Sequence, residues 1–451
     1  MQGWPLLITN GYEEPIGLDR TTRMKMIGNA VSSFHLREIL CQWRTVRVNE
    51  VNALTNVTPQ VLSAEQLENE LLSLSDSELR QWIATQLIGY TLPELDIELS
   101  ESSGPTAKPG ICYRIPAGQV EPVMYQVQKQ CENGYMVEVT YEHGMWCSPA
   151  FGKPKGRCWP GTDIPMYRIL SDLRKLNTAI KPPPAHWVGS CADARELATE
   201  VPSGSTSFLA CDISDAFSTC KLTKRAQQLC VIEINGKCFM YLGGPQGLAP
   251  MALFWNVHLQ DAFVKILGLH WRSYWVAFVD DLGIHGKNDT QCSNRARILS
   301  FVLDAIGKPH NFGVKGGTED RIWCSPPKPS MVLAGLHYDK DGIRCNEEII
   351  EVLRRTLTEY KVTNKSDAQH VVGVIQYSHT AFEWATEAYT RYSSLIKVLI
   401  TASKVEPKQR VDWNEQCKEA CQELLQHHES AIRLLVTIRS NIGFILSNHT
   451  H

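Results

Sequence analysis

Two adjacent carboxylates interrupt an apolar part of the chain. In AFVDDLGIHG, residues 277–286, Asp280 and Asp281 stand between two apolar runs, which predicts a β-hairpin with both acids at its tip. Like charges about 4 Å apart repel by roughly 1 to 4 kcal/mol, depending on the effective dielectric constant, so a positive partner is expected beside them. A second predicted strand, FLACDISDAF at 208–217, carries Asp212 in a similar position near its end.

Carboxylates from two separate strands, brought side by side, make an oxygen-rich site for a divalent cation. Mg²⁺ prefers carboxylates and substrate phosphates and keeps some of its water. Two such ions about 3.5–4 Å apart can activate an attacking hydroxyl and stabilise a leaving pyrophosphate. The pattern therefore points to nucleotidyl transfer, and a solvated turn remains the alternative for an acid pair taken alone.

The segments around these acids suit a nucleotide. Residues 241–260, between the two acid sites, form a glycine-rich turn that runs into a predicted helix. Earlier in the chain, WCSPAFGKPKGR alternates Lys153, Lys155 and Arg157 on a predicted hairpin. Fixed cations of this kind can stabilise the charge that develops on phosphates.

Six segments in this order resemble the reverse transcriptases of gypsy-type LTR retrotransposons: SPAFGKPKGR, YRILSDLRKLN, CDISDAF, GGPQGLAPMALF, FVDD and LAGLHYDKDGI. The resemblance covers roughly residues 111–428. It implies an α+β fold of the right-hand polymerase type, with fingers, an antiparallel palm sheet and a thumb. It also implies an RNA-directed DNA polymerase with two Mg²⁺ ions, replaceable by Mn²⁺. The implied partners are an RNA or DNA template with its primer, dNTPs and other parts of a retroelement polyprotein.

The resemblance assigns roles to individual residues around the acids. Asp212 and Asp280 match the metal ligands, with Asp281 as the supporting acid. Phe217 matches the aromatic ring that faces the ribose 2′ position and favours deoxynucleotides, although core packing is a competing interpretation. The backbone N–H groups of Asp215 and Ala216 would face the triphosphate.

Further roles follow for the turn and the predicted hairpin. Gln246 matches the residue that contacts the incoming nucleotide, and Gly247 would allow close backbone approach. Arg168 and one of Lys153 or Lys155 match the cations of the triphosphate site, and the sequence does not decide between the two lysines. Gly244 replaces the leucine that usually precedes the proline of this motif, a departure expected to loosen the turn.

The family's nucleic-acid contacts map onto three more positions. Phe278 replaces the commoner tyrosine before the acid pair, which removes a hydroxyl group. Trp323 and Gly335 stand where the primer-grip hairpin is expected. The basic residues of 346–410 could follow a duplex backbone, although each of them taken singly suits a solvated surface.

The chain divides into four segments by composition and periodicity. Residues 1–45 contain LDRTTRMKMIGNAVSSFHLREIL, which resembles the last block of DNA cytosine methyltransferases, with chance as the alternative. No Pro-Cys nucleophile dipeptide occurs, so methylation by this chain alone is excluded. Residues 46–110 form an acidic helical segment and linker, 111–345 the fingers and palm, and 346–451 the thumb and a partial connection.

The acidic helical segment carries two capping-box spacings, Ser63 with Gln66 and Ser75 with Glu78. Its two amphipathic faces predict a helical pair that packs on a neighbouring part of the fold, and a partner-binding helix is the alternative. At the other end, the sequence after Glu429 has no Asp or Glu, so we expect no RNase H domain, which needs several carboxylates. A fragment or degenerate copy of a polyprotein, reduced to binding nucleic acid, is the alternative to an active polymerase.

Composition fits this interpretation. The chain has 451 residues, 43% hydrophobic and 21% charged, with a net charge of −3, and the acidic excess is concentrated in residues 46–110. Its 15 cysteines occur singly, with no C-x-x-C pair, and predict reduced thiols. No window approaches 18 uninterrupted apolar residues, so we expect an intracellular protein, cytoplasmic or nuclear, without a membrane partner.

Overall fold

The computed structural model describes residues 62–100, 113–184, 187, 200–202, 204–312, 326–359, 361–379, 386–404 and 410–426. Three of the sequence predictions lie outside these residues: the methyltransferase-like block in 1–45, the role of Trp323, and the acid-free tail after Glu429. No helix of the described part is long and apolar enough to cross a membrane.

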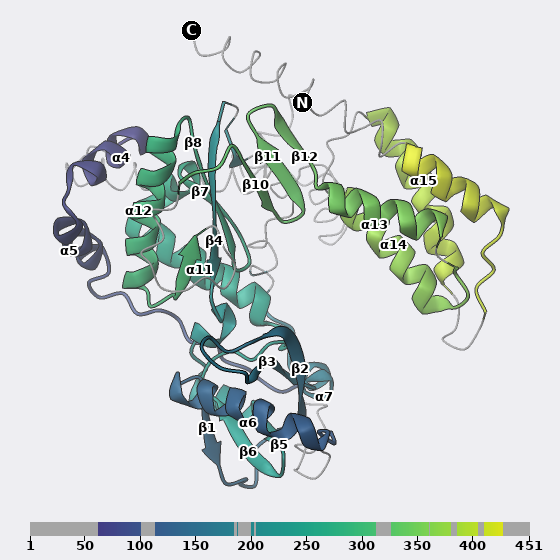
Figure 1. Cartoon of the computed structure of the whole chain (residues 1–451), viewed down its shortest axis with the longest axis horizontal. Helices are drawn as coiled ribbons and strands as arrows, with labels where there is room; N and C mark the ends of the chain where they lie inside the picture. The colour runs from purple at the N-terminus through teal and green to yellow at the C-terminus, as the bar shows by residue number, and fades with distance from the viewer. Residues whose placement is uncertain are drawn as a thin grey trace, which may run out of the picture. The chain divides into compact units, whose positions relative to one another are not determined.

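A four-stranded antiparallel sheet, which we call the palm sheet, carries the candidate acids. Its strand order is β7-β8-β4-β9, and Figure 1 shows helix α12 beside it, packed on β8 and β4. The inner face of α12 and more than half of the residues of α11 are buried, which gives this layer its apolar core. The elements are β4 Ser207–Ile213, β7 Trp275–Phe278, β8 Asp281–Gly286, β9 His310–Phe312, α11 Met251–Leu267, α12 Asp289–Ala305 and the 3₁₀ turns η1 Ala216–Thr219 and η2 Gly268–Ser273.

A second sheet of five strands, the fingers sheet, has the order β1-β6-β5-β2-β3. Strands β2 and β5 run parallel, and all other neighbours are antiparallel. Helix α6 packs on this sheet at Gly152, where a β-carbon would overlap with the side chain of Val123. The elements are α6 Ala117–Glu132, β1 Met136–Val139, β2 Cys147–Cys158, β3 Pro165–Ser171, α7 Arg174–Ala179, α10 Lys224–Leu229, β5 Val231–Ile234 and β6 Lys237–Tyr241.

A three-stranded antiparallel sheet packs on the palm. It consists of β10 Ser330–Leu333, β11 Leu336–Asp339 and β12 Gly342–Cys345. The run MVLAGLHYD forms a hairpin of two strands, because Ala334 and Gly335 between them both adopt positive φ values, 49° and 74°. Met331 and Leu333 of this hairpin share a buried cluster with Phe208 and Val276 of the palm sheet.

The C-terminal described residues form a helical unit. It contains α13 Glu347–Thr358, α14 Lys365–His379, α15 Thr386–Ser403 and the helical residues 415–426. One apolar cluster joins these helices, and Leu353, Ile375, Leu399 and Leu424 are all at most 1% exposed within it.

The acidic segment folds as a pair of helices, α4 Ala64–Ser73 and α5 Asp76–Gln86, and both predicted capping boxes are present. The pair packs on α12 and η2, and Figure 1 shows α4 and α5 beside α12. Glu68, 4% exposed, forms an ion pair with Arg295 of α12 at 2.8 Å. The Tyr274 hydroxyl donates to the Ala64 carbonyl at 2.6 Å. The pair is therefore built into the palm.

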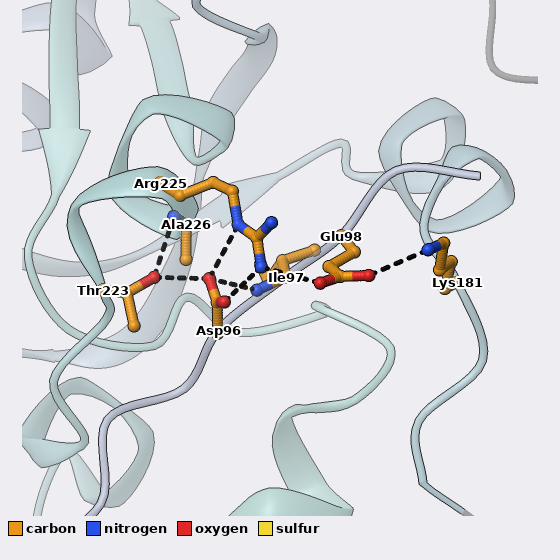
Figure 2. Close-up of polar contacts among 7 residues, drawn as sticks. All are labelled: Asp96, Ile97, Glu98, Lys181, Thr223, Arg225 and Ala226. Atoms are coloured by element: carbon orange, nitrogen blue, oxygen red, sulfur yellow. Dashed lines mark hydrogen bonds and ion pairs between the residues drawn. The ribbon is translucent and has the colours of Figure 1, made fainter. Parts of the chain in front are cut away.

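Residues 93–100, which we call the strap, connect this helical pair to the fingers. Backbone bonds join Leu95 to Lys221 and Ser100 to Ala179, at 2.9 and 2.8 Å. Figure 2 shows Asp96 between Arg225 and the Thr223 hydroxyl, with Glu98 between Arg225 and Lys181. The strap thereby ties the start of α10 to the segment after α7.

Candidate functional site

The pairing of β4 with β8 brings the candidate acids to one end of the palm sheet. Asp212 lies directly opposite Asp281, and the Ile213 N–H donates to the Asp280 carbonyl at 3.1 Å. Side chains directly opposite each other share one face of an antiparallel pair, with β-carbons about 4.5–5.5 Å apart. Two carboxylates so placed favour a cation between them.

Cys211 lies next to Asp212 but is fully enclosed. Burial raises the pKa of its thiol well above the usual value, and the charges of Asp212 and Asp281 raise that pKa further. A thiol in this state stays protonated and is a poor metal ligand. The oxygen donors of the acids are therefore the groups available to a cation here.

The tip of the β7–β8 hairpin is a two-residue turn of Val279 and Asp280. Val279 has a φ of 54°, and a positive φ at the first central residue is the pattern of a type II′ turn. A β-branched residue in this conformation costs about 1–3 kcal/mol. The indole N–H of Trp255 donates to the Val279 carbonyl at 2.5 Å, and this bond helps to hold the turn.

Phe217 sits on η1, directly after β4. Asp215 precedes η1 with a φ of 49°, a left-handed conformation that turns the chain sharply after the strand. The Phe217 carbonyl accepts the N–H groups of Cys220 and Gly244, at 3.0 and 3.1 Å. Its half-buried ring meets the Trp255 ring edge-on, with centroids 6.3 Å apart.

The glycine-rich turn after β6 is tight, which contradicts the loosening expected from Gly244. A β-carbon at Gly244 would overlap with the Sδ atom of Met251, because this buried methionine fills the adjoining space. A β-carbon at Gly243 would overlap with the Ser218 carbonyl. The Gly244 N–H donates to both Phe217 and Cys220, so the turn is tied to η1.

Gln246 and Gly247 are exposed on this turn, and Asn177 holds it from the fingers side. The Asn177 side chain donates to the Gly247 carbonyl at 2.8 Å and accepts the Ala249 N–H at 2.9 Å. Gly247 has a φ of 89°, a conformation that favours glycine. Sequence reasoning missed this role of Asn177, although the residue ends the quoted YRILSDLRKLN segment.

The candidate cations gather on the β2–β3 hairpin. Lys153 lies opposite Arg168 across the two strands, and both side chains are exposed. The pKa of Lys155 is lowered, first by desolvation and then by the charges of Arg168 and Arg157, while Asp215 acts in the opposite direction. The Lys155 side chain is solvent-accessible, and the charge of Asp215, the residue before η1, acts on its amine.

A hollow of about 740 Å³ adjoins Gln246 and Gly247 on the fingers. Tyr113 and Phe151 line it with exposed rings in edge-on contact, 5.3 Å between centroids. Arg174 lines it too and binds both oxygens of Asp172 at 2.7 Å, which with the Tyr113 hydroxyl lowers the pKa of that carboxyl group. Aromatic rings beside guanidinium groups suit stacked bases and phosphates.

The two remaining described nucleic-acid candidates lie close together. Phe278 ends β7 opposite Asp281 and packs against the same apolar cluster as Ala334. Gly335, the next residue, occupies the β10–β11 turn, and its carbonyl accepts the Asn346 N–H at 2.9 Å. Phe278, next to the acids, and the hairpin predicted as the primer grip therefore pack on one apolar cluster.

The donor set fits a cation that arrives with a substrate. In the described part of the chain, no three acidic, histidine or cysteine side chains group closely enough to hold a metal by themselves. Mg²⁺ in nucleotide sites is usually bound by one or two carboxylates, with phosphates and water as the remaining ligands. The facing Asp212 and Asp281, with Asp280 adjacent, meet that requirement.

Known proteins of similar fold agree with this geometry. The chain is similar to the foamy viral protease-reverse transcriptase in complex with an RNA/DNA hybrid, with a TM-score of 0.54 and 15% identity. The match covers 84% of this chain and 48% of the viral chain. For the same viral protein in complex with double-stranded DNA, the match covers 83% of this chain and 73% of the viral chain, with a TM-score of 0.51 and 17% identity. The fold is that of a reverse transcriptase. The sequence prediction of a polymerase-type fold with an antiparallel palm sheet is thereby confirmed.

Sequence comparison points to retroelements. The chain is 21% identical over 285 residues to the Transposon Tf2-3 and Tf2-4 polyproteins of Schizosaccharomyces pombe. This match covers 63% of the chain and 19% of each polyprotein, so the chain spans about a fifth of the length of these curated relatives. No protein-family model matches it. The chain therefore combines a reverse transcriptase fold with similarity to retrotransposon polyproteins.

Proposed function

We propose that this chain is an RNA-directed DNA polymerase of a retrotransposon that adds deoxynucleotides to a primer 3′-OH. One observation carries the proposal: the β4–β8 pairing sets Asp212 against Asp281 and beside Asp280, at the end of a palm sheet. Phe217 on η1, which follows β4, and the charge of Asp215 acting on Lys155 of the β2–β3 hairpin support the same assignment. Acids, ring and cations are the parts that nucleotidyl transfer needs.

In the reaction, the primer 3′ oxygen forms a bond to the α-phosphorus of the dNTP. The bond from that phosphorus to the bridging oxygen breaks, pyrophosphate leaves, and the 3′-OH proton passes to solvent. Asp212 and Asp280 would hold two divalent cations, with Asp281 in support. When bound, Mg²⁺ or Mn²⁺ would lower the pKa of the 3′-OH and stabilise the negative charge of the leaving pyrophosphate.

The remaining residues bind and orient the nucleotide. Lys155 and Arg168 would hold the triphosphate, and the position of Lys155 near Asp215 favours it over Lys153. The left-handed Asp215 next to Ala216 supports an anion-binding pair of backbone N–H groups. Phe217 would exclude the ribose 2′-OH, and Gln246 would contact the incoming nucleotide.

The nucleic-acid partners follow from the surfaces beside the site. The hollow with Tyr113, Phe151 and Arg174 suits a single template strand, because rings and cations bind stacked bases and phosphates without reading sequence. Phe278, Trp323 and Gly335 would contact the primer side. The foamy viral enzyme of similar fold was solved in complex with an RNA/DNA hybrid and with double-stranded DNA, which supports this class of partner.

The finer classification rests on the sequence. The six ordered motifs support a gypsy-type LTR element, and the N-terminal block supports a methyltransferase remnant in residues 1–45. Similarity to long polyproteins supports a chain that acts with other retroelement parts inside the cell.

Primer extension on an RNA template with Mg²⁺ or Mn²⁺ tests the proposal. Asp212→Asn and Asp280→Asn should each remove nearly all extension, because an amide carries no charge to hold the cation. Asp163→Asn, an exposed acid of the β2–β3 turn, serves as the matched control and should extend normally. Template–primer binding should persist in all variants, since it comes mainly from phosphate contacts.

A catalytically lapsed fragment gives a different pattern. It would bind template–primer in a salt-dependent way and extend no primer with either metal. That result would overturn the proposed activity and leave nucleic-acid binding as the function.

A further inference from the structure

One buried indole, Trp255 of α11, contacts three separate parts of the candidate site. Its side chain is 0% exposed. Its N–H donates to the Val279 carbonyl at the hairpin tip, its ring meets the Phe217 ring, and the Lys308 ammonium lies 4.9 Å from its ring centroid. α11 therefore reaches the acids and the ribose-facing ring through a single residue.

The bond to Val279 acts on the peptide that precedes Asp280. Because the peptide unit is planar, the direction of the Val279 carbonyl sets the direction of the Asp280 N–H. It thereby constrains the position of the Asp280 Cα atom. Val279 has a φ of 54°, which is unfavourable for valine. The hydrogen bond from Trp255 therefore stabilises a strained turn.

The bond is specific to Trp255. Trp271 and Trp275 are also buried in the palm, at 1% and 0% exposure. Among the described residues, nothing accepts a hydrogen bond from the indole N–H of either one. These tryptophans act as apolar packing groups, whereas Trp255 adds a directed polar contact to the site.

On its other side the indole supports η1. The Lys308 ammonium, above the indole face, donates to the Thr219 hydroxyl at 2.8 Å and to the Thr219 carbonyl at 3.3 Å. Thr219 is the last residue of η1, and Gly244 binds the Phe217 carbonyl from the opposite turn. The backbone of Phe217 is thus held by hydrogen bonds, and its ring faces the indole that is bonded to the hairpin tip.

We propose that Trp255 is a positioning residue that sets the Asp280 turn and the Phe217 ring relative to each other. The inference rests on the proposed polymerase function and deepens it. The indole hydrogen bond positions Asp280, and the indole ring positions the Phe217 ring that would face the ribose. Different substitutions at Trp255 can therefore remove one effect or both.

Two variants separate them. Trp255→Phe removes the donor and keeps an aromatic ring, whereas Trp255→Leu removes both. Trp271→Phe is the matched control, because it shortens a buried indole with no partner for its N–H among the described residues. Each variant is measured for Mn²⁺ affinity by electron paramagnetic resonance, for the ratio of dNTP to rNTP incorporation, and for melting temperature.

Trp255→Phe should weaken Mn²⁺ binding about fivefold, as expected for the loss of one hydrogen bond, and leave sugar discrimination unchanged. Trp255→Leu should weaken Mn²⁺ binding and also lower discrimination. Trp271→Phe should lower only the melting temperature. Equal Mn²⁺ affinity in Trp255→Phe, Trp271→Phe and the unsubstituted protein would overturn the inference.

A measurement without destabilising substitutions gives a second test. With 5-fluorotryptophan incorporated at position 255, the ¹⁹F resonance should move when Mg²⁺ is added, and the same label at position 271 should not respond. An unresponsive label at 255 contradicts the inference. If the unsubstituted protein extends no primer and Trp255→Phe still weakens Mn²⁺ binding, the polymerase proposal fails and the positioning role stands.

Discussion

Asp212 of β4 and Asp281 of β8 face each other across an antiparallel strand pair, one residue from a strained turn. Directly opposed like charges destabilise a sheet, by up to about 1 kcal/mol. A cation bound between the two carboxylates would remove the repulsion between them.

The first prediction follows from this cost. Without metal, Asp281→Asn should melt at a higher temperature than the unsubstituted protein, because the repulsion with Asp212 is gone. Added Mg²⁺ should raise the melting temperature of the unsubstituted protein more than that of the variant, which keeps Asp212 and Asp280 but has lost the supporting acid. Differential scanning fluorimetry in EDTA and in Mg²⁺ measures both. Asp163→Asn is the control, and a variant that gains as much from Mg²⁺ as the unsubstituted protein contradicts the site.

The second prediction concerns sugar choice. Phe217→Val should open space beside the ribose and admit ribonucleotides, so the ratio of dNTP to rNTP incorporation should fall by at least tenfold, about 1.4 kcal/mol of discrimination. Phe263→Leu, a buried α11 ring that contacts Trp271 and Trp275, should lower stability and leave the ratio unchanged. An unchanged ratio in Phe217→Val would leave core packing as the role of this ring.

The third prediction is a pH dependence set by Lys155. The pKa of its amine is lowered, so it loses its charge at a lower pH than an ordinary lysine. Because kcat/KM reports the free enzyme, kcat/KM for the dNTP should decline as the pH rises through this lowered pKa. Lys155→Arg keeps the charge at all these pH values and should abolish the decline.

Lys153→Arg, on the same strand, is the control and should leave that alkaline decline in place. A decline that persists in Lys155→Arg would assign it to another group.

The fourth prediction tests the attachment of the helical pair to the palm. Glu68→Gln leaves the Arg295 charge buried without its partner, and such a break costs about 3–5 kcal/mol. Urea unfolding should show a loss of this size. Glu138→Gln breaks an exposed pair with Lys237 and should cost less than about 1 kcal/mol. Equal losses in the two variants would show that α4 contributes no buried ion pair.

Local patterns in the sequence predicted much of this structure. The capping boxes at Ser63 and Ser75 and the acids at the β7–β8 turn depend on residues within a few positions of one another. Such short-range signals survive in one sequence, because turn and cap chemistry is decided locally. The order of motifs then indicated the polymerase fold, which the structural neighbours confirm.

The remaining features depend on contacts between distant residues. Asn177 holds a turn about 70 residues away, and Trp255 reaches a carbonyl 24 residues away. Met251 fills the space beside Gly244, so the missing leucine is compensated by a residue that no local motif identifies. The preference for Lys155 over Lys153 stays a proposal, and it rests on the charge of Asp215, which belongs to another part of the fold.

The ion pair between Glu68 and Arg295 also has a consequence for synthesis on the ribosome. The two residues are 227 positions apart. At about 5–20 residues per second, roughly 10–45 s pass between their translation. During that time the apolar faces of α4 and α5, with Leu71 and Leu79 at 0% exposure in the folded chain, have no palm to cover them. The acidic charge of this segment is then the feature of its own sequence that opposes aggregation until α12 emerges.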